Sequence, residues 1–226
     1  MGKIILTLFF VFNFTMQFCG QNPELGNSKI DLKTFSVKFN VNDFYKNQIE
    51  THKKSLEFYS QGKTKEAFSK ELLKDYKFVE NVDTLFIDKD KYLLLYLMKG
   101  MDTKDTLATF GSIRFQKLDM ITNEKKYFQS LRATSWAYKD NKKNFNNLKN
   151  ELQNTYGNPK IIVETFEHGE YYEWVTKDFV VNLIVDIDEE SDGKISFATK
   201  LYLTDKNEYE KLKSNVFGKT KYYWIY

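Results

Sequence analysis

Hydrophobic and polar positions along this chain repeat with two periods, and the shorter period predicts strands. A period of two, in which every second side chain is apolar, is typical of a half-buried strand. Segments with this pattern, or with short apolar runs, are 35–41, 84–87, 92–97, 113–118, 128–138, 160–167, 171–176, 179–187 and 195–203. Polar turns separate the strands between 82 and 138, so this section predicts an antiparallel meander. The aromatic tail at 221–226 predicts a further edge strand.

The longer period predicts about four helices, because apolar residues recur at helical spacing in one stripe. The stripes cover 45–59, 68–76, 145–156 and 205–212. Gly62 follows the first stripe, and Gly157 with Pro159 gives the third a C-terminal stop. Asp205 and Glu208 can form a capping box for the last helix. The two periods together predict an α+β fold, in which antiparallel sheet packs against about four helices.

The first residues have the layout of a secretion signal. Lys3 precedes an apolar run over 4–12, and the run continues with polar breaks to Cys19. A basic start followed by a short apolar core is typical of a signal peptide. The run is too short and too interrupted for a membrane span of about 20 residues. We therefore expect the protein to be exported.

The processing of this signal has two interpretations. Cys19 at the end of the apolar core resembles the modified cysteine of a bacterial lipoprotein signal, which would become the lipidated first residue of the mature chain. Ordinary signal cleavage near Gly20 is the alternative. The lipoprotein interpretation is preferred, and it implies contact with the membrane through an N-terminal lipid. The expected organisation is a signal peptide over 1–18, a polar tether over 19–31 and a single domain over 32–226, with a division into sub-domains 32–140 and 141–226 left open.

Composition narrows the expected location and partners. Cys19 is the only cysteine among 226 residues, so the exported domain must fold without disulfides, which favours a bacterial envelope protein. The net charge is +3, and lysines alternate with acidic residues throughout the chain. No basic block is interleaved with aromatic residues, so we expect no nucleic-acid partner.

An acidic segment offers the one metal-binding pattern. Asp188, Glu190 and Asp192 precede Gly193 with part of the spacing of a calcium loop, but Thr199 stands where a bidentate glutamate is needed. Strand-like flanks favour an acidic hairpin turn, with a weak calcium site as the alternative. We expect no cofactor.

The two histidines indicate no metal or catalytic site. His52 lies on an apolar stripe, as a packed histidine would, and His168 lies in a turn. No zinc-binding spacing accompanies either residue. A catalytic arrangement of residues distant in sequence stays open.

Aromatic residues are the remaining binding candidates. Trp136, Tyr172, Trp174 and Trp224 could provide stacking surfaces for a sugar or a peptide. Alternate residues of a strand point to opposite faces, however, and one face is normally core. Packing in the core is therefore the competing interpretation of these four residues.

A resemblance accompanies the C-terminal half. Tyr-Gly-Asn-Pro at 156–159, followed by a strand and then Tyr-Tyr-Glu-Trp at 171–174, is similar to a pattern in small envelope proteins and lipoproteins of Gram-negative bacteria, notably the Bacteroidota. It covers roughly 142–212, and it implies an envelope location and no catalytic residue.

These observations favour a non-enzymatic envelope binding or accessory protein with a protein or glycan partner. The alternatives are a periplasmic immunity-type inhibitor of a toxin and an envelope hydrolase. An acidic patch around 186–192 would favour the first alternative, and a pocket that gathers a histidine with carboxylates would favour the second.

Overall fold

The computed structural model describes residues 29–46, 50, 54, 57, 60–62, 78–88, 91–100, 106–138, 142–164, 169–189 and 195–210. The strands are β1 (Ile30–Asp31), β2 (Phe78–Asp88), β3 (Lys91–Gly100), β4 (Ala108–Phe110), β5 (Ile113–Phe115), β6 (Lys117–Asn123), β7 (Phe128–Tyr138), β8 (Lys160–Glu164), β9 (Gly169–Val175), β10 (Phe179–Glu189) and β11 (Ile195–Asp205). The helices with described bounds are α1 (Val41–Phe44) and α4 (Lys143–Tyr156).

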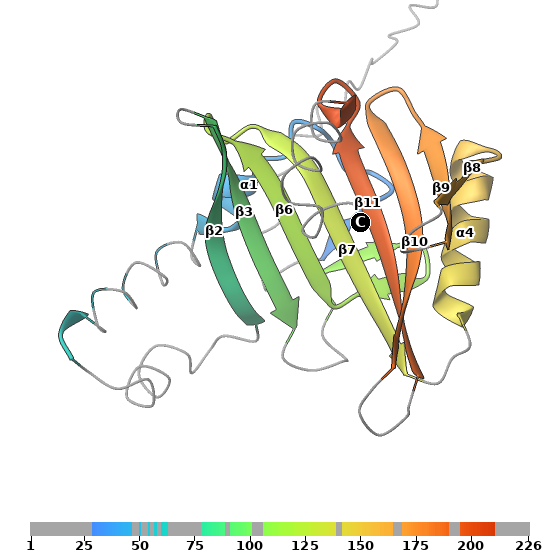
Figure 1. Ribbon diagram of the computed structural model, residues 1–226, viewed down its shortest axis with the longest axis horizontal. Helices are drawn as coiled ribbons and strands as arrows, with labels where there is room; N and C mark the ends of the chain where they lie inside the picture. The colour runs from blue at the N-terminus through green and yellow to red at the C-terminus, as the bar shows by residue number, and fades with distance from the viewer. Residues whose placement is uncertain are drawn as a thin grey trace, which may run out of the picture.

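Eight of these strands form one antiparallel sheet in the order β2-β3-β6-β7-β11-β10-β9-β8. Each half of the chain contributes a meander that ends at the centre of the sheet, where β7 pairs with β11 (Figure 1). The register sets Arg132 opposite Tyr202. This pairing joins residues on both sides of position 140 in one sheet. A small sheet of β1, β4 and β5 lies behind the large one in this view.

The expected α+β fold with about four helices is wrong, because the structure is mostly β. Among the described residues, α4 is the one long helix, and α1 has only four residues. The segment 45–59 is helical at its described positions 46, 50, 54 and 57, as is Ser60 just after it, and Gly62 follows with a φ of +73°. The expected helix over 68–76 lies outside the described residues. Of the one expected over 205–212, residues 205–210 are described, and only Tyr209 and Glu210 among them are helical.

The strand expected over 35–41 is also wrong. Residues 33–40 form short turns and irregular backbone without strand pairing, with the Phe39 amide donating to the Ser36 carbonyl at 2.9 Å. Asn40 then caps α1, because its side-chain oxygen accepts from the Asp43 amide at 3.1 Å. Phe35 packs against Phe128, with ring centroids 5.1 Å apart, so the alternation reflects anchoring of an irregular segment to the core.

Most of the remaining predicted elements are confirmed. β2 and β3 form the expected hairpin, α4 covers 145–156, and β8 to β11 follow the expected segments. One predicted strand, 113–118, is divided between β5 in the small sheet and β6 in the large one. The tail at 221–226 lies outside the described residues.

The large sheet has two chemically different faces. The core face carries apolar side chains such as Leu118, Leu131 and Leu201, which belong to one buried cluster with residues of α1, α4 and the small sheet. Because side chains alternate along a strand, the opposite face carries Asp119 and Arg132, and it also holds a second buried apolar cluster that includes Leu95, Ile121 and Tyr202. We call this second surface the polar face.

Candidate functional site

The candidate site is a surface pocket between the segment 37–42 and the turn that joins β6 to β7. Its volume is about 360 Å³. The residues that line it are Val37, Lys38, Phe39, Asn40, Asn42, Lys125, Lys126, Tyr127 and Phe128. Three of the nine are lysines and none is acidic, so the pocket wall carries a positive charge.

The turn at residues 123–127 is held by four hydrogen bonds centred on Asn123. Its carbonyl accepts from the Lys126 amide at 2.9 Å, and its own amide donates to the Tyr127 carbonyl at 3.0 Å. Its side-chain oxygen accepts from the amides of Lys125 and Tyr127, each at 3.0 Å. This arrangement is a three-residue hairpin loop with a bulge, in which the last loop residue is usually glycine.

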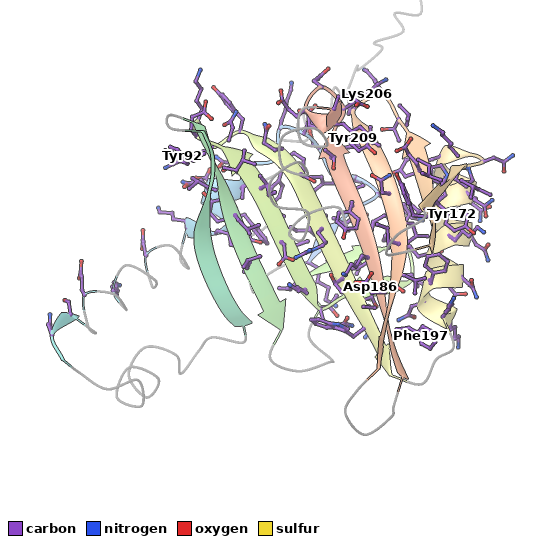
Figure 2. The ribbon with its side chains drawn as sticks, in the orientation of Figure 1. Tyr92, Tyr172, Asp186, Phe197, Lys206 and Tyr209 are labelled. Atoms are coloured by element: carbon purple, nitrogen blue, oxygen red, sulfur yellow. The ribbon has the colours of Figure 1, made fainter. Side chains whose placement is uncertain are left out.

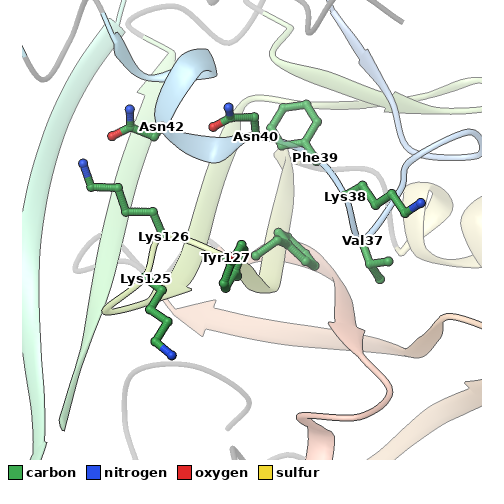
Figure 3. Close-up of a pocket in the computed structure, with 9 residues that line it drawn as sticks. Val37, Lys38, Phe39, Asn40, Asn42, Lys125, Lys126 and Tyr127 are labelled. Atoms are coloured by element: carbon green, nitrogen blue, oxygen red, sulfur yellow. The ribbon is translucent and has the colours of Figure 1, made fainter. Parts of the chain in front are cut away.

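Lys126 occupies that glycine position, with a φ of +65°. A side chain in the left-handed region costs on the order of 1 kcal/mol. The turn therefore keeps a lysine at a position where glycine would be more stable. Figure 3 shows the Lys126 side chain reaching toward Asn42, whereas Lys125 and Lys38 extend in other directions.

The other wall of the pocket is built by the irregular segment before α1. Phe39 packs on Phe44, with ring centroids 5.4 Å apart, and this contact fixes the backbone on both sides of Asn40. The Asn40 amide is used for capping, since it also donates to Asp43 Oδ2. Asn42 is half-buried at the pocket wall, and Tyr127 is 67% exposed beside it.

The polar face holds a second cluster of charged side chains, centred on Asp119. Its carboxylate is fully buried, and Oδ2 accepts from Arg132 Nε at 2.9 Å and from Nη2 at 2.6 Å. Lys117 Nζ lies 3.3 Å from the same oxygen. Burial disfavours the charged guanidinium, but Asp119 and Tyr202 outweigh it and raise the pKa of Arg132. Among described side chains, Asp119 Oδ1 has no hydrogen-bond partner.

Lys200 extends this cluster toward the β10–β11 end of the sheet. It forms an ion pair with Asp186, which is labelled in Figure 2. Burial lowers the pKa of Lys200 to about 8, and the positive charges of Arg132 and Lys117 act in the same direction. The Asp119 carboxylate opposes this shift in the pKa of Lys200, since a negative charge favours the charged amine.

A third polar group lies near the β8 edge of the same face. The Tyr209 hydroxyl donates to Glu173 Oε2 at 2.8 Å, and the Asn182 amide donates to the same oxygen at 3.3 Å. Burial and the Glu173 carboxylate both raise the pKa of Tyr209. All three residues are buried, so we interpret this group as an internal hydrogen-bond network.

The structure places three of the four candidate aromatic residues away from the pocket. Tyr172 and Trp174 are buried on the core face, where Trp174 Nε1 donates to the Gly157 carbonyl at 2.8 Å. The Tyr172 ring packs on Phe145, with centroids 5.9 Å apart. Trp136 is half-buried on β7, and its amide donates to Gln116 Oε1 at 3.2 Å.

Several other candidates fall partly or wholly outside the described residues. Asp188 lies on β10 opposite Ser196 of β11, so the flanks of the acidic segment are strands. The remaining members of the calcium candidate, Glu190 and Asp192, are outside the described residues, as are Cys19, His52, His168 and Trp224. Within the described part of the chain, no three histidine, cysteine or acidic side chains are grouped to hold a metal ion.

The pocket lysines were not identified as candidates from the sequence. The turn Asn123-Glu124-Lys125-Lys126 was expected between two strands, but only as a connection. The available signal was the absence of glycine from so short a hairpin turn, which indicates a left-handed residue with a side chain.

Comparison with protein families, with curated protein sequences and with solved structures returned no match to this chain. In the described residues, no helix has the length and apolar character needed to cross a membrane.

Proposed function

We propose that this protein is a non-enzymatic binding protein of a bacterial envelope, and that its pocket takes an anionic glycan chain. The observation that carries the proposal is the lysine held at Lys126 in a left-handed backbone conformation beside Lys38 and Lys125. Backbone strain that a glycine would relieve is a feature of functional sites.

The distribution of charge favours a chain over a single small anion. The three ammonium groups surround the pocket instead of meeting at one point (Figure 3). Spaced positive charges suit a polymer with repeated carboxylate groups. No ion pair involves these lysines among the described residues, so their charges are available to a ligand.

The uncharged part of the pocket favours sugar over peptide. The exposed ring of Tyr127 offers an apolar face with a polar edge, and Asn42 offers an amide that can both donate to and accept from hydroxyl groups. A few polar groups around an aromatic surface are typical of a site that orients a small ligand unit.

Titration calorimetry with the purified protein tests this proposal. We expect a uronic-acid oligosaccharide to bind, and a neutral oligosaccharide of equal length to bind at least tenfold more weakly. Lys126→Gly should weaken binding, whereas Lys142→Gly should not, because Lys142 is, among the described residues, the other non-glycine residue with positive φ and follows the far end of β7. Equal binding of both sugars, or preferential binding of a poly-glutamate peptide, would overturn the glycan proposal.

The envelope location is part of the same proposal and has its own test. A lipid on Cys19 would hold the domain at a membrane surface, with the residues between Cys19 and β1 as a tether. Mass spectrometry of the mature N-terminus should find a lipid-modified Cys19. An unmodified chain that begins after this residue would contradict the anchor while leaving the binding site untouched.

A further inference from the structure

We propose that the protein forms a homodimer through β8, the last strand of the large sheet, paired antiparallel with β8 of a second copy. β8 pairs with β9 on one side and has no strand on the other among the described residues (Figure 1). An edge strand presents unpaired backbone N–H and C=O groups to any strand that can align with it.

The five residues of β8 are complementary to themselves when two copies run antiparallel. Their sequence is Lys-Ile-Ile-Val-Glu. With Ile162 on the two-fold axis, Lys160 lies opposite Glu164 of the second copy, and Ile161 lies opposite Val163. Both ends therefore join opposite charges, and the centre joins apolar residues, which stabilises cross-strand pairs.

This register also satisfies the backbone. Residues on one strand direct their hydrogen-bonding groups alternately to the two sides, so only every second residue of β8 faces outward. In the proposed register, each residue of one copy pairs with a residue of the second copy, and the two residue numbers differ by an even number. Outward-facing groups therefore meet outward-facing groups, and the contact is isologous, as a closed dimer requires.

The exposure of Ile161 is consistent with such a contact. Its side chain is 55% exposed, although it lies on a strand beside the buried Tyr172. The other edge strand, β2, provides a contrast, because its sequence contains Glu80, Asp83 and Asp88 and no basic residue. Two copies of β2 would bring acidic residues together, whereas two copies of β8 pair lysine with glutamate.

Sedimentation velocity of the full exported chain tests the dimer. Five residue pairs form a small interface, so we expect a reversible dimer whose population rises with protein concentration. Ile161→Lys should give a monomer, because it places a charge in the apolar centre. Val175→Lys adds the same charge at a 61% exposed position on the neighbouring strand β9 and should leave the dimer intact.

Charge reversal distinguishes this register from a general loss of folding. Lys160→Glu should weaken dimerisation about tenfold, since it sets two acids opposite each other at both ends. The double variant Lys160→Glu/Glu164→Lys should restore it. A wild-type chain that stays monomeric at the highest concentration, or a single reversal without effect, would overturn the proposal.

Crosslinking in the intact envelope provides a second readout. Ile162→Cys places a thiol on the axis, where paired strands bring the two Cα atoms about 4.5–5.5 Å apart, within the range of a disulfide. We expect a covalent dimer under oxidation with Ile162→Cys and none with Val175→Cys or with the wild-type chain. Equal crosslinking of both variants would contradict pairing through β8.

Discussion

Arg132 and Asp119 face each other across β6 and β7, and two guanidinium nitrogens donate to the same buried carboxylate oxygen. A buried ion pair is costly to break from one side, because the remaining charge has no compensation. Arg132→Met should therefore lower the free energy of unfolding by about 3–5 kcal/mol, as measured by urea denaturation. The double variant Arg132→Met/Asp119→Leu should recover most of this loss. A double variant as unstable as the single one would show that the pair itself stabilises the sheet.

Stability should depend on alkaline pH through Lys200. Its pKa is about 8 in the folded protein and about 10.5 in the unfolded chain. Between these values the unfolded chain binds more protons, so the free energy of unfolding should rise with pH, by up to about 3 kcal/mol.

The tyrosines limit this rise at higher pH. Burial raises the pKa of Tyr202 above 10, so above pH 10 the unfolded chain loses protons first and stability should fall. Urea denaturation at several pH values checks both slopes. Lys200→Met should abolish the rise between pH 8 and 10 and leave the fall, and an unchanged rise in this variant would contradict the assignment to Lys200.

Gly111→Ala should destabilise the small sheet. Gly111 begins the two-residue turn between β4 and β5, where its φ is +58° and an added Cβ would lie 2.7 Å from the Glu151 carboxylate. The substitution would strain the turn and displace Glu151 from its ion pair with Lys33, which is 2.7 Å long. We expect a loss of about 1–2 kcal/mol in thermal or urea denaturation.

Gly62→Ala is the control for the steric part of this effect. Its φ is also positive, at +73°, but an added Cβ would meet no atom within 4 Å. We expect the Gly62 variant to lose less stability than the Gly111 variant. Equal losses would assign the whole effect to backbone conformation.

Replacing the two left-handed lysines by glycine should stabilise the fold. Lys126 and Lys142 have φ values of +65° and +66°. Removing the backbone strain stabilises the folded protein by more than the added flexibility of glycine stabilises the unfolded chain. The free energy of unfolding of each variant should therefore rise by up to about 1 kcal/mol. Differential scanning calorimetry measures the gain. A lower midpoint for Lys126→Gly would remove the strain argument for the pocket.

The local pattern of apolar residues predicted most strands and the long helix, because the buried side chains of these elements recur with the period of a strand or of a helix. The stripe of Phe145, Leu148 and Leu152 is buried as expected, and Gly157 ends α4. The pattern failed at Phe35, Val37 and Phe39, which are also apolar at every second position. Turn hydrogen bonds and the Asn40 cap decide the backbone there, and periodicity does not report them.

The candidate site could not be assembled from the sequence for a different reason. Lys38 and Lys126 are far apart along the chain, and core contacts such as the packing of Phe35 on Phe128 bring their segments together. The buried charges on the polar face could not be predicted either. Asp119 and Arg132 meet only because β6 pairs with β7 in this register.

The central pairing of β7 with β11 constrains the order in which the chain can fold. β2, β3, β6 and β7 are close in sequence and can pair as soon as residue 138 is available, but β7 then keeps an open edge. Only the arrival of residues 195–205 closes it. The complete sheet is therefore a late, long-range event, and an N-terminal fragment that ends before β11 would expose its central strand to other chains.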